Sequence, residues 1–254
     1  MPEPRVLMYD IETSPNLGYV WGKWDQNVLR FKNEWHILSF AWKWANEQKV
    51  QVLGLDDFVG YKRGSTNDAG LASELWHLFD EADVTVAHNG DKFDRRKSNA
   101  RFVQLGFNPP SPYRTVDTLK IARQHFYFNN NALDDVARVL GVGRKGDAGG
   151  FDTWLGCMAG NPKAWKRMKR YNRQDVVVLE AVYEALRPWM TTHPNMAVIA
   201  ENPDACPKCG SGPLRKRGTR KINGVTANAV YQCQACWGYG TSRLPVKGAR
   251  PNFK

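Results

Sequence analysis

Acidic residues near the N-terminus have the spacing of a metal-binding pair. Asp10 and Glu12 follow a short apolar run and lie two residues apart, so an extended backbone projects both carboxylates from one face. Two close carboxylates repel each other unless a cation lies between them. Carboxylate oxygens are ligands that Mg²⁺ and Mn²⁺ prefer. Taken alone, however, the pair also fits a turn or a salt bridge.

Two further acidic positions lie later in the chain. Asp91 and Asp94 follow Asn89 at a predicted strand-to-helix junction, where N-terminal capping is the simplest role and the preferred one for Asp91. For Asp94, capping and a functional role are equally well supported. Tyr171 and Asp175 lie four residues apart on a predicted helix and therefore share a face. By itself this last pair also fits a partly buried tyrosine beside a solvated carboxylate.

Cysteines form a second set of candidate ligands. Four of the five cysteines make two Cys-x-x-Cys pairs separated by residues 210–232, and these are Cys206, Cys209, Cys233 and Cys236. Four thiolates suit tetrahedral Zn²⁺, and in a short module zinc binding supplies the folding energy. We therefore predict a structural zinc ribbon, because a fully thiolate-bound zinc offers no open position for catalysis. A redox dithiol or an Fe–S site is the alternative.

Positive charge indicates a polyanionic partner. The chain has 36 Lys and Arg against 25 Asp and Glu, a formal charge of +11, which favours nucleic acid. No apolar run approaches about 18 residues, so membrane association is not expected. Between the cysteine pairs lie five basic residues that would contact phosphates from a hairpin, unless they only add solubility: Arg215, Lys216, Arg217, Arg220 and Lys221.

Apolar periodicity predicts the elements that position these residues. Strands are expected at 5–11, 36–44, 49–55, 84–87 and near 115, and helices at 70–82, 91–105, 118–125, 132–140 and 162–186. Strands followed by alternating helices and strands indicate an α/β domain with a mixed sheet. The helical pattern stops between 188 and 203, so we predict two domains, residues 1–198 and 199–254.

Together, the acidic motifs resemble those of the DEDD superfamily of 3′→5′ exonucleases. Asp-x-Glu on a strand, Asn-x-x-x-Phe-Asp after a strand and Tyr-x-x-x-Asp on a later helix agree in order and spacing over about residues 5–186. Tyr171, where other members carry His, is typical of the branch that includes the proofreading domains of family A and B DNA polymerases. The resemblance implies a ribonuclease H-like fold, a mixed five-stranded sheet flanked by helices, followed here by the small zinc ribbon.

The same resemblance implies a mechanism and a ligand set. Two Mg²⁺ or Mn²⁺ ions would be bound by four carboxylates, Tyr171 would position the attacking water, and Thr13 and Asn89 would lie near the terminal nucleotide; the four carboxylates are those of Asp10, Glu12, Asp94 and Asp175. The substrate would be a single-stranded or frayed DNA end, cleaved to 5′-mononucleotides. Alternatives are an RNA-directed or endonucleolytic nuclease of this fold, and a non-catalytic nucleic-acid-binding adaptor.

Two regions bear on partners and location. Because no polymerase domain follows the motifs, the exonuclease is expected to act alone or to serve a separate DNA polymerase. The N-terminal apolar run is interrupted at Asp10, so no signal peptide is expected and the location is cytoplasmic, the host cytoplasm for a phage-encoded chain.

Residues 21–35 are rich in aromatic and basic side chains that either stack on single-stranded bases or pack in the core.

Overall fold

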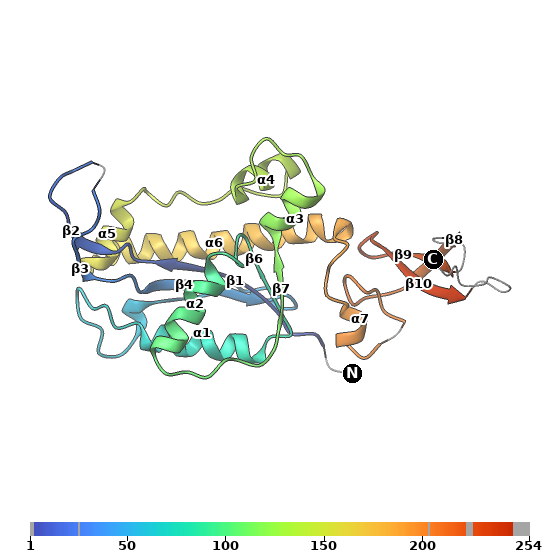
Figure 1. The fold of residues 1–254 in the computed structure, drawn as a ribbon, viewed down its shortest axis with the longest axis horizontal. Coiled ribbons are helices and arrows are strands. Elements are labelled where there is room, and N and C mark those ends of the chain that lie inside the picture. The colour runs from blue at the N-terminus through green and yellow to red at the C-terminus, as the bar shows by residue number, and fades with distance from the viewer. Residues whose placement is uncertain (1–2, 25, 203, 222–225, 246–254) are drawn as a thin grey trace, which may run out of the picture. The chain divides into compact units, whose positions relative to one another are not determined.

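A mixed five-stranded sheet forms the centre of the larger part of the chain (Figure 1). The computed structural model describes residues 3–24, 26–202, 204–221 and 226–245. In the sheet, β4 is antiparallel to β1 and β5, whereas β6 is parallel to β1 and β7. The strand order is β5-β4-β1-β6-β7, with β1 Val6–Thr13, β4 Ile37–Trp44, β5 Gln51–Gly54, β6 Val84–Ala87 and β7 Arg114–Asp117.

Helices flank this sheet, as the sequence pattern predicts. The helices are α1 Ala69–Glu81, α2 Asp94–Gln104, α3 Thr118–His125, α4 Leu133–Leu140, α5 Asp152–Met158, α6 Pro162–Leu186 and α7 Met196–Ile199, with short 3-10 turns at Leu55–Asp57 and Arg187–Trp189. The predicted α/β fold class is confirmed, although α5 and α7 were not predicted. None of the helices in the described part of the chain combines the length and apolar character that crossing a membrane requires.

Successive side chains of β1 point alternately to the two faces of the sheet. Leu7, Tyr9 and Ile11 are buried in the core with α1, where the rings of Tyr9 and Phe79 lie 5.0 Å apart, edge to face. The intervening positions, among them Asp10, therefore point to the opposite face. Figure 1 shows α6 on that face and α1 on the other. The strand thus supplies a hydrophobic core on one side and carboxylates toward α6 on the other.

A buried ion pair fixes α6 against the sheet. Lys43 on β4 is almost fully buried, and its Nζ lies 2.7 Å from both carboxylate oxygens of Glu180 on α6. Breaking such a pair would leave an uncompensated charge with little solvent, so the contact strongly favours one register of the helix. It thereby determines which residues of α6 face β1.

Two smaller sheets complete the fold. A hairpin of β2 (Leu17–Tyr19) and β3 (Arg30–Asn33) connects β1 to β4. A three-stranded antiparallel sheet of order β10-β9-β8 follows the α-helices, with β8 Leu214–Lys221, β9 Thr226–Cys233 and β10 Tyr239–Pro245.

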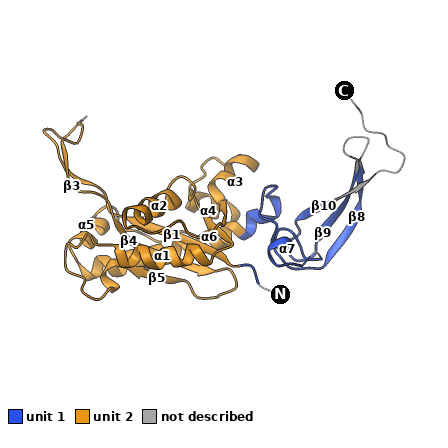
Figure 2. Cartoon of the chain, turned by 60° about the horizontal axis from the view of Figure 1, so that its bottom comes forward, with its two compact units in different colours: residues 1–4, 184–254 blue, residues 5–183 orange. Residues whose placement is uncertain are grey.

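The chain divides into two compact units, residues 5–183 and residues 1–4 with 184–254 (Figure 2). The predicted domains, 1–198 and 199–254, stay a prediction.

Candidate active site

Carboxylates from β1 and α6 meet on one face of the sheet. Asp10, Glu12 and Asp175 each place an oxygen within 4.8 Å of the others, and we call these three residues the acidic cluster. Asp175 is 1% exposed, and its Oδ1 has no hydrogen-bond partner within the described part of the chain. A buried, unpaired carboxylate oxygen is costly and calls for a ligand.

Asp94 lies beside the acidic cluster as the first residue of α2. Its side chain is 3% exposed, and Oδ1 accepts a hydrogen bond of 3.1 Å from the backbone N–H of Ile11, the residue between Asp10 and Glu12. The carboxylate is therefore attached to the same strand segment as the cluster. The N-cap residue of α2 is Phe93 and α2 has no side-chain cap hydrogen bond, whereas Asp94 lies in the first turn, where its charge can offset the helix dipole.

The loop before α2 is shaped by residues on either side of it. Asn89 has a positive φ of 65°, and a Cβ at Gly90 would lie 2.5 Å from that of Ala87, so this turn requires glycine. Asp117 caps α3 by accepting from the backbone N–H groups of Leu119 and Lys120, and it also accepts a 2.9 Å hydrogen bond from the Asn89 backbone N–H. Asp91 was predicted to cap α2, but it instead pairs with Lys120 and Arg95.

Burial and mutual repulsion favour the protonated forms of these acids. Burial, followed by the charges of Glu12 and Asp94, raises the pKa of Asp10 well above its ordinary value. Burial, then the charge of Asp175, raises the pKa of Glu12 to about 8. Burial raises the pKa of Asp94 to about 7, and it also raises the pKa of Asp175. Bound cations would favour ionisation of these groups.

Lys145 provides the one cation that contacts the acidic cluster among the described residues. Its Nζ lies 2.6 Å from Asp175 Oδ2 and 5.1 Å from the centre of the Tyr171 ring. Burial lowers the pKa of Lys145, but the charge of Asp175 outweighs burial and the pKa lies above its usual value. This lysine comes from the loop between α4 and α5, and no motif in the sequence indicates it.

Tyr171 is half-buried, one helical turn before Asp175. Its hydroxyl lies close enough to Asp175 and Lys145 for these groups to influence one another's pKa values. Burial raises the pKa of Tyr171 to about 12, so the hydroxyl keeps its proton at neutral pH and can orient a water molecule without acting as a base. The predicted pairing of Tyr171 and Asp175 on one helix face is therefore present.

Two residues that sequence reasoning missed hold the carboxylates in position. Asn172, fully buried on α6, donates from Nδ2 to Asp10 Oδ2 at 2.6 Å, and Ser39 on β4 donates to Asn172 Oδ1 at 3.1 Å. Trp154 on α5 lies close enough to Glu12 to oppose the rise in its pKa. Asn172 shares a helical face with Asp175, which is a usable sequence signal, whereas nothing in the sequence singles out Trp154.

The donor set fits hard divalent cations. The site offers only carboxylate oxygens, with one buried oxygen unpaired and no thiol or imidazole ligand in the acidic cluster. Such ligands suit Mg²⁺ or Mn²⁺.

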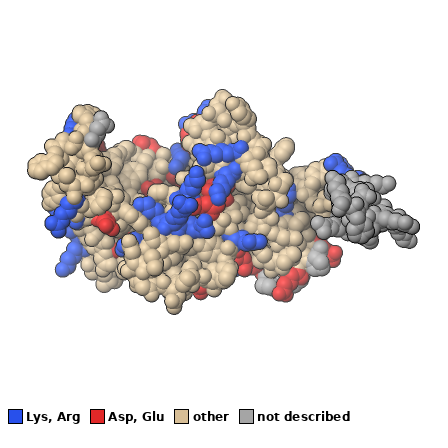
Figure 3. Space-filling model, viewed as in Figure 1, with Lys and Arg blue, Asp and Glu red and all other residues tan. Residues whose placement is uncertain are grey.

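Of the predicted substrate contacts, Thr13 ends β1 next to Glu12 and Asn89 precedes α2, and both are half-buried. On the face shown in Figure 3, basic side chains surround a group of acidic ones, which favours approach of a polyanion.

The four predicted zinc ligands come together in the other unit. Cys206 Sγ lies 3.8 Å from Cys236 Sγ, and Cys209 Sγ lies 3.7 Å from Cys233 Sγ, with all four sulfurs within 4.8 Å. Zn–S bonds of about 2.3 Å in a tetrahedron require sulfur separations of about 3.8 Å, so the arrangement fits zinc and excludes disulfides.

Backbone and hydroxyl groups donate hydrogen bonds to some of these sulfurs. The N–H groups of Lys208 and Ala235 donate to Cys206 and Cys233 at 3.4 and 3.3 Å. Although burial raises it, hydrogen bonding with Ser211 lowers the pKa of Cys209 to about 7. The Ser211 contacts stabilise negative charge on Cys209 before a metal is added. Burial raises the pKa of Cys206 and raises that of Cys236 to about 12, so a bound cation would be needed to ionise these two thiols.

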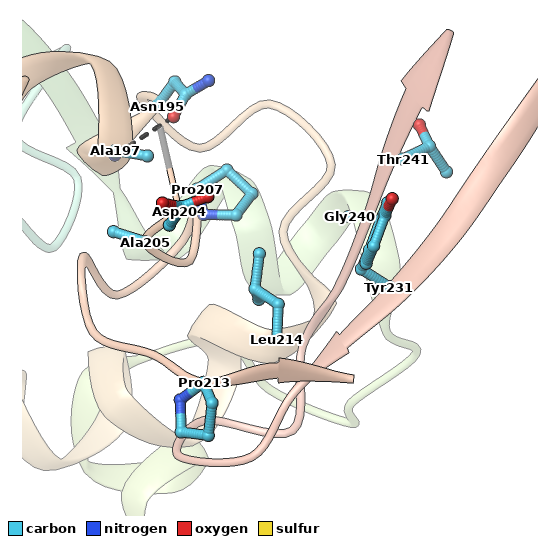
Figure 4. Close-up of a pocket in the computed structure, with 10 residues that line it drawn as sticks. All are labelled: Asn195, Ala197, Asp204, Ala205, Pro207, Pro213, Leu214, Tyr231, Gly240 and Thr241. Carbon is cyan, nitrogen blue, oxygen red and sulfur yellow. Dashed lines mark hydrogen bonds between the residues drawn. The ribbon is translucent and has the colours of Figure 1, made fainter. Parts of the chain in front are cut away.

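The predicted basic hairpin corresponds to β8, where the basic side chains are exposed: Arg215, Lys216, Arg217 and Arg220. The side chain of Lys221 lies outside the described residues. A cavity of about 610 Å³ opens in the same unit, lined partly by Pro207, Leu214 and Tyr231 (Figure 4). It contains none of the predicted ligands.

Comparison with known families agrees with the fold. A family model described as the RNase_H superfamily matches residues 32–187, more than half of the 254 residues. The match includes Asp94, Tyr171 and Asp175 and begins after Asp10 and Glu12. No curated protein matches the chain.

We expect the metal-free protein to lose stability as the pH rises. An acid whose pKa is higher in the folded state than in the unfolded state stabilises the fold fully when the pH is below its unfolded-state pKa of about 4. This contribution is lost as the pH rises past the folded-state pKa, which is about 7 for Asp94 and about 8 for Glu12. Protein freed of Mg²⁺ by dialysis should show a lower Tm at pH 8.5 than at pH 5.5, and added Mg²⁺ should raise Tm more at pH 8.5. A Tm at pH 8.5 that does not respond to Mg²⁺ contradicts this account.

We also expect one zinc ion per chain, lost on removal of one thiolate. Cys206→Ser leaves three sulfur ligands and should abolish stoichiometric zinc, as measured by elemental analysis of the purified full-length protein. Cys157→Ala is the matched control, because this buried cysteine lies on α5 and is not one of the four predicted zinc ligands. The zinc content of this variant should stay at the wild-type value. Wild-type protein without stoichiometric zinc would refute the assignment.

Proposed function

Because the chain belongs to the RNase_H superfamily, whose members are commonly metal-dependent nucleases, we propose that it is a two-metal 3′→5′ exonuclease of the DEDD superfamily. The observation that carries the proposal is the meeting of the acidic cluster with the Tyr171 hydroxyl on one face of the sheet. A tyrosine beside the last carboxylate, rather than a histidine, supports the tyrosine-containing branch.

In this proposal Asp10, Glu12, Asp94 and Asp175 hold two Mg²⁺ or Mn²⁺ ions. When bound, the ions activate water and stabilise the charge that develops on the attacking and leaving oxygens. Asn172 keeps the Asp10 carboxylate aimed at the site through its 2.6 Å hydrogen bond. Tyr171, protonated at neutral pH, orients the attacking water. Lys145 pairs with Asp175 and offsets part of the negative charge of the cluster.

The proposed substrate is the 3′ end of single-stranded or frayed DNA, released as 5′-mononucleotides. The excess of basic residues supports a nucleic acid, and the tyrosine-type motif favours DNA over RNA. Residues 199–254 are proposed to form a zinc ribbon that helps to hold longer strands through the exposed basic side chains of β8. The catalytic and zinc sites use different ligand chemistry, so each has its own requirement for a metal.

The expected products are a ladder. Incubation with Mg²⁺ or Mn²⁺ should shorten a 5′-labelled single-stranded DNA one nucleotide at a time, because only the terminal phosphodiester is hydrolysed, and RNA of the same length should be degraded more slowly. Gel analysis of product lengths, with chromatography of the released mononucleotides, measures this. A single internal cut indicates an endonuclease, faster RNA degradation indicates an RNA-directed enzyme, and an unchanged strand indicates a binding adaptor.

Substitutions should separate the metal-binding residues from the water-orienting one. Asp10→Asn should lower kcat/KM on single-stranded DNA by about 10³-fold or more, because it removes a ligand to the metals. Tyr171→Phe keeps the ring and loses the hydroxyl, so a decrease of about 10- to 100-fold is expected.

Asp147→Asn is the control, since this exposed residue lies in the loop after Lys145 and its substitution should leave the rate unchanged. Wild-type activity in the Asp10→Asn protein would exclude the mechanism. Full activity in Tyr171→Phe would exclude only the role of the hydroxyl.

A further inference from the structure

The β2–β3 hairpin exposes aromatic side chains that a stable fold ordinarily buries. We call residues 17–24 and 26–33 the aromatic hairpin. Trp21 and Trp24 are 87% and 75% exposed, and Tyr19 and Phe31 are exposed as well. Figure 2 shows the hairpin extending away from the five-stranded sheet. Core packing, one of the two interpretations of this segment, is therefore wrong for these tryptophans. A cluster of exposed large apolar groups marks an interaction surface.

The aromatic hairpin is attached firmly to the strand that carries the acidic cluster. At its base, the Ser14 and His36 backbones bond at 2.9 Å, and the Ser14 hydroxyl lies 3.0 Å from His36 Nδ1. Further along the hairpin, the backbone N–H of Trp35 donates to Asn16 Oδ1 at 2.9 Å. Ser14 is separated from Glu12 by one residue. The position of the hairpin is therefore tied to the end of β1.

Contacts on α2 extend the aromatic surface back toward the site. Lys97 Nζ lies 3.6 Å from the centre of the Trp35 ring and 5.8 Å from that of Phe93. Phe93 is 38% exposed and directly precedes Asp94. A line of rings and one ammonium group thus runs from the start of α2 to the base of the hairpin. This line of contacts therefore begins at the residue before Asp94.

The charge of the hairpin selects among partners. It contains three cationic residues, Lys23, Arg30 and Lys32, against one acidic residue in the sequence of residues 17–33. All three are exposed, and Lys23 Nζ lies 5.1 Å from the centre of the Trp24 ring. Aromatic rings interleaved with cations match the bases and phosphates of a single strand. An apolar protein partner would gain nothing from the cations.

We propose that the aromatic hairpin is a stacking surface for unpaired bases of the strand whose 3′ end enters the acidic site. Trp21 and Trp24 stack on bases 5′ of the scissile bond, and the neighbouring cations pair with phosphates. This inference rests on the proposed function for the position of the 3′ end. The binding of a single strand by the hairpin does not require that the bond be cleaved.

Binding by the full-length Asp10→Asn protein, in which turnover is suppressed, tests the surface directly. Fluorescence anisotropy with a labelled 20-nucleotide oligothymidylate at several salt concentrations measures affinity. Trp21→Ala with Trp24→Ala should weaken binding by about 10-fold or more at each salt concentration, because stacking is lost while the phosphate contacts remain. Replacing both by Phe should restore most of the affinity. Lys23→Gln, Arg30→Gln and Lys32→Gln together should reduce the salt slope by about 2.

Tyr127→Ala is the matched control, because Tyr127 is a fully exposed aromatic residue outside the hairpin, and its substitution should leave affinity unchanged. Wild-type affinity in the double-alanine protein overturns the proposal. So does loss of self-association, measured by sedimentation, without loss of DNA binding, since it would make the hairpin a contact between two copies of the chain.

Hydrolysis distinguishes failure of this proposal from failure of the proposed function. The p-nitrophenyl ester of thymidine 5′-monophosphate is too small to span the site and the hairpin. In the chain with Asp10 intact, the double-alanine protein should hydrolyse it at the wild-type rate and degrade the 20-nucleotide strand more slowly. An equal decrease on both substrates would show damage to the active site and overturn the stacking role. A wild-type chain inactive on both would refute the exonuclease and leave the binding result standing.

Discussion

Repulsion among buried carboxylates is the constraint on which this site depends. Asp10, Glu12 and Asp175 place oxygens within 4.8 Å of one another, with Asp94 attached to the same strand. Water cannot screen these charges because the groups are largely buried. The chain relieves the repulsion by raised pKa values and by the ammonium group of Lys145. Divalent cations would do so more completely, and they would also supply the chemistry of phosphodiester hydrolysis.

The surrounding structure keeps these acids together against their repulsion. The Lys43–Glu180 pair fixes α6 to β4, and Asn172 then connects Ser39 on β4 to Asp10 on β1. Asp117 holds the turn that leads to Asp94. Each contact restricts an element that carries a predicted metal ligand. The site is therefore preorganised by hydrogen bonds and buried ion pairs rather than by flexible side chains on loops.

Most elements of the sheet unit follow from apolar periodicity, because α1, α6 and the central strands bury one regular face or a continuous run. The spacing Asp10-x-Glu12 and Tyr171-x-x-x-Asp175 likewise anticipates which carboxylates share a face. Lys145 could not be predicted, since its loop is placed by tertiary contacts such as the bond from Gln174 to the Arg144 carbonyl. The solvent exposure of Trp21 and Trp24 also could not be predicted, because composition does not distinguish a core tryptophan from a surface one.

The most direct test of the central claim is the location of bound metal. Diffraction from crystals soaked in Mn²⁺, recorded with anomalous scattering, should show two peaks in contact with the carboxylates of Asp10, Glu12, Asp94 and Asp175. Each carboxylate should be ionised, and Lys145 should no longer be the only cation beside Asp175. Absence of manganese from these carboxylates, at concentrations that support nuclease activity, would contradict the account.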